Sequence, residues 1–343
     1  MRHGSTVSVP AHDPPSTLDI VAGEKRLHVV TGKGGTGKST VAAALALGLA
    51  AQGRTVLLCE VEGRQGIAQL FDVPPLPYEE RQVAATDDGA VYALAIDAEE
   101  ALLEYLAMFY RLGRAGKALD RFGVIDFATT IAPGVRDVLL TGKVYEAVRR
   151  RDEAGAYTYD AVVLDAPPTG RITRFLNVNE EVAGLAKVGP VRRQADSIMT
   201  MMRSQRTAVH LVTLLEEMPV QETMDAINDL NAATLGVGHV IVNQVLPSPL
   251  DDAAAERVAS GALTPAAVAK SLARVEDELG PSAAEGLLLE GHAHVARQRL
   301  QSHQRAVLTE AGAPVVELPH LEDGVDLGGL YDLGGRLVEG GVR

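Results

Sequence analysis

The sequence reads Gly32-Lys33-Gly34-Gly35-Thr36-Gly37-Lys38-Ser39-Thr40 between a short apolar run and a segment rich in Ala and Leu. Residues 27–30 favour a buried strand, and residues 38–51, which Gly53 follows, favour a helix. A glycine-rich turn between a strand and a helix directs backbone N–H groups at phosphate oxygens, and the helix N-terminus adds a positive dipole end. The pattern GxxxxGK(S/T) in this context predicts a phosphate-binding loop.

The residues of this loop have distinct expected roles in holding ATP and Mg²⁺. Lys38 is expected to reach the β- and γ-phosphates, and Ser39 is expected to bind Mg²⁺. The other expected contacts to the nucleotide from this loop come from Gly34, Gly35, Thr36, Gly37 and Thr40. The alternative is a glycine-rich turn that matches the pattern by chance. The flanking strand and helix make that the weaker interpretation.

Further apolar runs predict the rest of a sheet. They lie at residues 55–59, 90–96, 160–165, 209–214, 237–242 and 314–318, with segments of helical periodicity between them. This alternation predicts an α/β fold with a doubly wound, mostly parallel sheet. Residues 1–23, rich in Pro, Ser, His and Asp, are expected to form a disordered lead-in. Residues 24–343 are expected to form a single P-loop ATPase domain, with helical insertions near residues 98–153, 177–207 and 251–312.

Composition argues against several classes of protein. The formal net charge of −13 argues against nonspecific binding to nucleic acid. Cys59 is the only cysteine, so the chain has no CxxC motif for a zinc site, and no zinc is expected. No apolar run reaches the roughly 18 to 20 residues that span a bilayer, and the N-terminal stretch does not resemble a signal peptide. The expected location is therefore cytoplasmic, with any attachment at the membrane supplied by a partner.

An acidic residue is expected beside the magnesium ion. The apolar run that begins at Tyr159 ends in Asp165, and strands of this kind place a carboxylate at the carboxyl edge of a parallel sheet. Asp165 is expected to act on Mg²⁺ through a water molecule. The alternative is a purely structural role, in which Asp165 caps the turn into the next helix.

Two segments carry a family resemblance. With Lys33 the loop has the form K-G-G-x-G-K, which resembles the deviant P-loop of MinD/ParA ATPases, nitrogenase iron protein and the arsenite-pump and tail-anchored-protein-targeting ATPases. Residues 165–171 read D-A-P-P-T-G-R and are similar to the D-T-A-P-T-G-H switch of the last two; Ala166, Pro167 and Arg171 depart from it. The chain is identified as an ArsA-like ATPase, most similar to the actinobacterial single-module group labelled anion-transporting ATPase.

The resemblance implies roles for further residues. Lys33 would cross a dimer interface to the partner's nucleotide, so a homodimer or a heterodimer with a paralogous ATPase chain is implied. Glu62 stands where the family has an aspartate that orients the attacking water, and its extra methylene puts efficient hydrolysis in doubt. Backbone N–H groups near Gly170 would sense the γ-phosphate. Asn243 would read adenine and Pro319 would flank the base.

Together with the loop and Asp165, the resemblance implies a dimeric switch that Mg-ATP closes and hydrolysis opens, with Lys33, Lys38, Glu62 and Asp165 as catalytic residues. Its client, a membrane partner or a hydrophobic protein, is not identified by the sequence. One alternative is an ATP-binding regulatory subunit of a heteromeric complex with little turnover of its own. Another is a MinD/ParA-like positioning ATPase, which the acidic charge disfavours. Metalloid transport is disfavoured because a single Cys59 cannot form a multi-cysteine site.

Overall fold

A mixed sheet forms the centre of the molecule. The computed structural model describes residues 25–110, 133–177, 190–275 and 280–343, and within them the sheet has the strand order β3-β4-β2-β5-β1-β6-β7-β8. Neighbouring strands pair in parallel except β3, which is antiparallel to β4. The strands are β1 Leu27–Gly32, β2 Thr55–Glu60, β3 Arg81–Ala85, β4 Ala90–Ala95, β5 Ala161–Asp165, β6 Thr207–Thr213, β7 Val237–Val245 and β8 Val315–Pro319.

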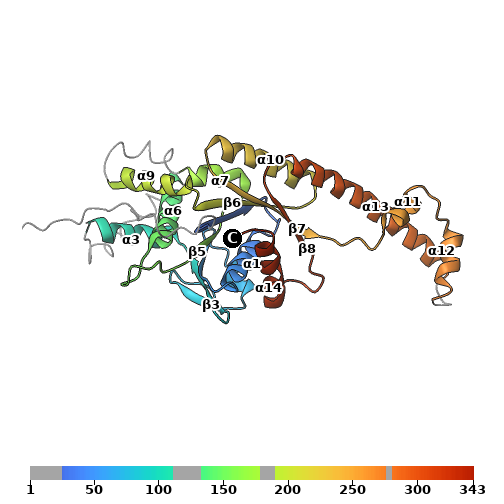
Figure 1. Cartoon of the computed structure of the whole chain (residues 1–343), viewed down its shortest axis with the longest axis horizontal. Helices are drawn as coiled ribbons and strands as arrows, with labels where there is room; N and C mark the ends of the chain where they lie inside the picture. The colour runs from blue at the N-terminus through green and yellow to red at the C-terminus, as the bar shows by residue number, and fades with distance from the viewer. Residues whose placement is uncertain (1–24, 111–132, 178–189, 276–279) are drawn as a thin grey trace, which may run out of the picture.

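Helices cover both faces of this sheet. In the view of Figure 1, α1 (Lys38–Ala50) and α14 (Leu327–Glu339) lie below it, and α7 (Thr169–Leu176) and α10 (Glu217–Ala232) lie above it. The short α2 (Gly66–Leu70) follows β2. At one end of the molecule lie α3 (Ala98–Tyr110), α6 (Pro133–Arg149) and α9 (Pro190–Met202). These layers are those of a doubly wound α/β fold.

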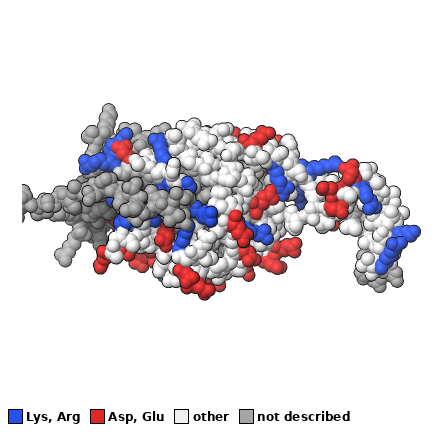
Figure 2. Space-filling model, in the orientation of Figure 1, with Lys and Arg blue, Asp and Glu red and all other residues white. Residues whose placement is uncertain are grey.

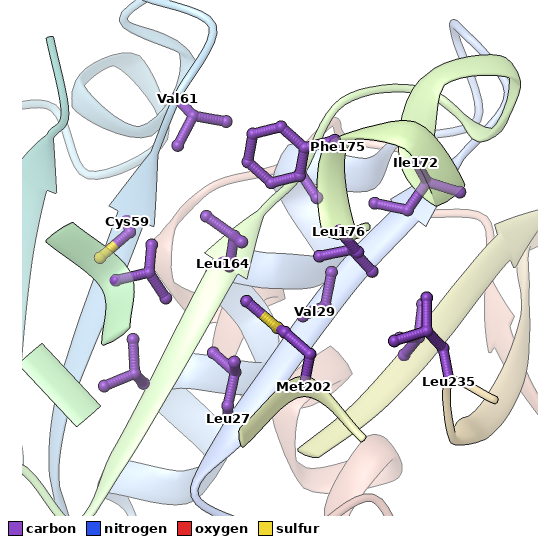
Figure 3. Close-up of a cluster of buried hydrophobic side chains, with 14 of the residues drawn as sticks. Leu27, Val29, Cys59, Val61, Leu164, Ile172, Phe175, Leu176, Met202 and Leu235 are labelled. Atoms are coloured by element: carbon purple, nitrogen blue, oxygen red, sulfur yellow. The ribbon is translucent and has the colours of Figure 1, made fainter. Parts of the chain in front are cut away.

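The central strands are apolar throughout because both faces of the sheet are buried. Val29 belongs to the core beneath α7 and α10, whereas its neighbour Val30 belongs to the core beneath α1 and α14. Figure 3 shows the first of these cores, where Phe175 of α7 lies over Leu164 of β5. Cys59 is buried in the same core, as the apolar run around it predicts. The loops at the carboxyl ends of the strands are thereby held on a packed base.

Helix α1 is buried almost all round, because it lies between the sheet and α14. Its sequence is apolar on every side, which is typical of a helix enclosed by protein. Gly48 of α1 and Gly334 of α14 meet so closely that a Cβ on Gly48 would lie 2.5 Å from the Gly334 carbonyl oxygen. This contact seats the helix that begins at the predicted phosphate-binding loop.

Three helices extend away from the core and are called the arm below. They are α11 (Asp252–Ala259), α12 (Pro265–Leu272) and the long α13 (Pro281–Thr309), and Figure 1 shows them running out to one side. Both α11 and α12 pack on α13, and α13 packs on α10 of the core. On the face shown in Figure 2, the arm carries basic and acidic side chains, whereas acidic ones gather along the lower side of the core.

The predicted α/β fold with a mostly parallel sheet is confirmed. Each predicted strand is present, but β3 was not predicted, because it is a partly exposed edge strand with no apolar run. The predicted insertions contain α3 and α6, then α9, and then the arm. Residues 1–23 and parts of all three insertions lie outside the described residues, and the division of the chain into a lead-in and one domain stays a prediction. Within the described ranges, no helix is long and apolar enough to cross a membrane.

Candidate functional site

The predicted phosphate-binding loop joins β1 to α1 at the carboxyl edge of the sheet. Gly35 (φ 89°) and Gly37 (φ 87°) adopt the left-handed conformation that glycine tolerates at no steric cost. Any Cβ on Gly37 would lie 2.3 Å from Nδ2 of Asn243, so the position has no room for a side chain. The Lys33 carbonyl accepts hydrogen bonds from Thr36 Oγ1 at 2.9 Å and Lys38 Nζ at 3.3 Å.

The space around the loop fits a magnesium–nucleotide complex. Cβ atoms built on Gly34, Gly35 and Gly170 would meet no atom within 4 Å. The loop and the segment 165–171, called the second switch below, therefore border open space. Two buried polar atoms near them have no hydrogen-bond partner, Glu60 Oε1 and Thr169 Oγ1. Open space over a glycine-rich loop, together with unpaired buried oxygens, is what a site for a polyanion and its cation requires.

Ser39 and Asp165 are brought together by the pairing of β1 with β5. The Ser39 hydroxyl donates a 2.6 Å hydrogen bond to Asp165 Oδ2. Burial raises the pKa of Asp165 to about 6, with the Ser39 hydrogen bond opposing the shift and the nearby Glu60 adding to it. A hydroxyl and a carboxylate are the protein ligands that Mg²⁺ takes beside phosphate oxygens. Ser39 and Asp165 can therefore hold Mg²⁺ directly or through water.

Glu60 is a second carboxylate at this edge, and the sequence analysis did not single it out. It ends β2 opposite Asp165 of β5, it is 2% exposed, and its Oε2 accepts a 3.3 Å hydrogen bond from the Ile67 amide. The signal that singled out Asp165, a carboxylate at the end of an apolar run, could also have found Glu60. That Glu60 lies opposite Asp165 follows only from the pairing of β2 with β5.

The predicted catalytic Glu62 lies two residues beyond Glu60, in the loop after β2. Its carboxylate forms a 3.5 Å ion pair with Arg64, whose side chain is mostly exposed. The pKa of Lys38 is lowered by burial, while the charges of Asp165 and Glu62 raise it and that of Arg64 lowers it. Glu62, Asp165 and Lys38 therefore share one electrostatic environment at the loop.

Lys33 has a different environment from Lys38. Its ammonium group forms an ion pair with Glu222 of α10, and both side chains are partly exposed. Through this ion pair, Glu222 of α10 contacts the phosphate-binding loop. No spacing in the sequence marks this contact, because the two residues lie 189 positions apart.

The second switch begins α7. Thr169 is the first residue of that helix and is buried, and Gly170 is exposed. Arg171 lies 3.8 Å from Asp137 of α6, so the departure from the family pattern at residue 171 meets the helical insertion. The structure thereby joins the second switch to α6.

Asn243, the residue expected to bind adenine, contacts the phosphate-binding loop. Its Nδ2 donates a 2.9 Å hydrogen bond to the Thr36 carbonyl, and the next residue, Gln244, has a left-handed backbone (φ 56°). Asn243 also lines a cavity of about 520 Å³. Other residues that line it include His320 after β8, and Arg297, Leu300 and Gln301 of α13.

Pro319, which was expected to flank the base, is not among the residues that line this cavity. Pro319 ends β8 beside β7, but the following residue, His320, is the one that borders the cavity. Arg297 and Gln301 come from the arm, and the sequence analysis did not predict them. Their helix is far from β7 in sequence, and only the packing of α13 brings it to the cavity.

Two sulfur-bearing side chains of α9, Met199 and Met202, are buried in the core beneath that helix. Burial raises the pKa of the Cys59 thiol. Within the described ranges no group of three or more His, Cys, Asp and Glu side chains is arranged to hold a metal ion.

Comparison with known proteins points to a family of ATPases. The family model described as anion-transporting ATPase matches residues 25–205 and 185–262. The chain is 54% identical over 330 residues to the Mycobacterium tuberculosis protein named ATPase BagA, covering 96% of each chain. It is 25% identical over 317 residues to the Acidiphilium multivorum arsenical pump-driving ATPase, covering 88% of this chain and 53% of that one. With the Escherichia coli arsenical pump-driving ATPase the identity is 25% over 247 residues, covering 64% of this chain and 39% of that protein.

Proposed function

The chain belongs to the anion-transporting ATPase family and is an ATP hydrolase, and from this premise we propose that two subunits close around Mg-ATP and reopen after hydrolysis. The partner is a second copy or a paralogous ATPase chain. The open space over the loop and the pairing of Ser39 with Asp165 support the nucleotide site. Closure would couple to a client through the helical insertions.

Each residue at the site has a role that follows from its position. The loop amides from Gly34 to Thr40 and the Lys38 ammonium group bind the phosphates, and Ser39 and Asp165 hold Mg²⁺. Bound Mg²⁺ neutralises negative charge that develops on the phosphates. Glu62 orients the attacking water, and the backbone near Gly170 changes shape when the γ-phosphate leaves. Asn243 and the segment around Pro319 border the base.

The observation that carries the two-subunit proposal is the different placement of the two loop lysines. Lys38 is buried and bonds to the carbonyl of Lys33 inside the loop. Lys33 is partly exposed, and its ammonium group bonds outside the loop. A cation at the exposed rim of a phosphate-binding loop can reach a nucleotide held by a facing subunit, where it stabilises charge in the transition state.

The proposed client is a hydrophobic protein segment. The arm carries a mainly apolar cavity of about 520 Å³, with Leu250, Leu263 and Leu287 among its lining residues. Arg297 borders both this cavity and the one beside Asn243. Occupancy at one cavity is therefore in a position to affect the other through α13.

ATP hydrolysis and molecular mass test the proposal together. Wild type, Lys33→Ala and Lys38→Ala are compared by steady-state hydrolysis and by light scattering with and without Mg-ATP. The wild type is expected to form a two-subunit complex in the presence of Mg-ATP. Lys38→Ala is expected to lose nucleotide binding, and Lys33→Ala is expected to bind ATP but to hydrolyse it poorly. Lys270→Ala, at an exposed position of α12, is the matched control. A wild type that hydrolyses ATP as a monomer at every concentration contradicts the two-subunit proposal.

A second candidate is a nucleotide-binding subunit that depends on another chain for turnover. The observation in its favour is the ion pair of Glu62 with Arg64, which engages the carboxylate that would orient water. Glu62→Asp restores the shorter side chain of the family pattern. A rise in hydrolysis by the purified variant supports a self-sufficient site held back by the longer side chain. No rise, together with activation by an added paralogous chain, supports the subunit role.

A further inference from the structure

The exposed lysine of the loop is already neutralised within its own subunit. The Lys33 ammonium group forms an ion pair with the Glu222 carboxylate, and the two side chains are 30% and 38% exposed. Phosphate oxygens or a facing subunit would compete with Glu222 for the same cation. In this conformation, therefore, Lys33 is not available to a second nucleotide site.

The loop around Lys33 is held by hydrogen bonds within the same subunit. The Lys33 carbonyl accepts from Thr36 and Lys38, and the Thr36 carbonyl accepts from Asn243. These bonds tie the backbone of the loop to α1 and β7, whereas the Lys33 side chain is tied to α10. The Lys33 side chain can therefore leave Glu222 while the backbone hydrogen bonds of the loop stay intact.

Glu222 lies on a helix that contacts the other moving parts of the proposed switch. Helix α10 packs on α7, which begins at the second switch, and on α13, which forms the arm. Thr223, the next residue, is buried and donates a 2.8 Å hydrogen bond to the Pro219 carbonyl, which fixes this turn of the helix. The ion pair therefore connects the loop to a helix that packs both on α7 and on the arm.

We propose that Glu222 is a positioning residue that holds Lys33 within its own subunit until a second subunit docks. Pairing transfers the Lys33 ammonium group from Glu222 to the facing nucleotide site, and leaves the Glu222 carboxylate free. The inference rests on the proposed two-subunit function and adds a residue that opposes premature closure. Because the pair is partly exposed, the hold is weak enough for docking to overcome.

The strength of the hold sets the expected size of the effect. Removing the carboxylate is expected to strengthen ATP-dependent pairing about two- to five-fold, the ratio that about 0.4–1 kcal/mol corresponds to. The Lys33 amine is expected to react about two- to five-fold faster with an acylating reagent in the ATP-free protein, because no carboxylate engages it. The change in the acylation rate is a property of the single subunit and does not require association with a second one.

The experiment compares wild type, Glu222→Gln and the control Glu317→Gln, all as the full chain. Glu317 forms an ion pair with Arg305 at nearly the same exposure, 37%, and lies on β8. Acylation of Lys33 is followed by mass spectrometry without nucleotide. Pairing with Mg-ATP is followed by light scattering over a range of concentrations, and ATP affinity is measured on the same samples.

Faster acylation of Lys33 and tighter pairing in Glu222→Gln, with neither change in Glu317→Gln, supports the inference. Acylation at the wild-type rate overturns it, as does pairing that is unchanged or weaker in Glu222→Gln. A large loss of ATP affinity in Glu222→Gln also overturns it, since Glu222 would then bind the nucleotide itself. If two wild-type subunits do not associate in the presence of Mg-ATP, the proposed two-subunit function is wrong. The proposed release of Lys33 from Glu222 is then wrong as well.

Discussion

The Ser39 hydroxyl donates a 2.6 Å hydrogen bond to Asp165 Oδ2, although 126 positions separate the two residues. Ser39 follows β1 and Asp165 ends β5, and these strands are neighbours in the sheet. Parallel neighbours end at the same edge, so the loop after one strand and the last residue of the other meet there. The contact unites the two halves of the proposed magnesium site.

Asp165→Asn tests this site directly. The variant is expected to lower Mg-dependent ATP hydrolysis by about 100-fold or more, because an amide neither carries the charge that holds Mg²⁺ nor aligns its water. Hydrolysis is measured against Mg²⁺ concentration. Asp160→Asn is the control, since Asp160 lies at the other end of β5 and accepts a 2.8 Å hydrogen bond from the Thr55 amide. Equal losses in both variants would point to a folding defect and contradict the assignment.

Buried histidines predict a pH dependence of stability. His28 and His210 lie 3.1 Å apart between ring nitrogens, and His239 packs beside His210. Burial lowers the pKa of His28 to about 3, with the charge of Arg54 adding to the shift, and burial also lowers the pKa of His210 and of His239.

The unfolded chain therefore binds more protons than the folded one below pH ~6.5, and stability is lost as the pH falls. His28 alone is expected to cost about 2 kcal/mol between pH 7 and pH 5. Urea unfolding at several pH values measures this loss. His28→Asn is expected to flatten the profile below pH ~6.5, whereas His292→Asn, at an exposed position, is expected to leave it unchanged. Parallel profiles for His28→Asn and wild type would refute the prediction.

The contact between α1 and α14 predicts opposite effects at adjacent glycines. A Cβ on Gly334 would lie 2.4 Å from the Ala44 carbonyl, whereas one on Gly335 would meet nothing within 4 Å. Gly334→Ala is expected to lower the free energy of unfolding by about 1–3 kcal/mol, because the helices must separate. Gly335→Ala is expected to raise it by about 0.5–1 kcal/mol through helix propensity. Denaturant unfolding measures both free energies. Equal changes in Gly334→Ala and Gly335→Ala would contradict the close packing of α1 against α14.

The two cavities that meet at Arg297 predict a link between the arm and nucleotide binding. Arg297→Ala is expected to weaken ATP binding about three- to ten-fold, because the guanidinium group that lines the cavity beside Asn243 is lost as a hydrogen-bond donor to the nucleotide. Arg299→Ala is the control, since Arg299 pairs with Glu256 at 3.5 Å and lines a different cavity. Calorimetric titration with ATP measures both. Affinities that fall equally would show that the arm as a whole, rather than Arg297, supports the site.

Local patterns were sufficient to predict the glycine-rich turn between β1 and α1 and most of the sheet. The loop requires glycines, a lysine and a hydroxyl at fixed spacing, and apolar runs mark strands that are buried on both faces. The edge strand β3 was missed because it is short and none of its residues is buried, so it left no long apolar run in the sequence. The family and the ATP hydrolase activity predicted from the loop and the second switch are confirmed by the comparisons.

By itself, the sequence determined the class of the fold, the glycine-rich turn between β1 and α1 and the membership in a family of ATPases. These depend on short-range order, in which neighbouring residues share one loop, one strand or one helix. Only the tertiary structure decided that Glu60 lies opposite Asp165, that Glu222 forms an ion pair with Lys33 and that Arg297 borders two cavities. Such contacts join residues far apart in the chain, and they exist because strand order and helix packing bring those residues together.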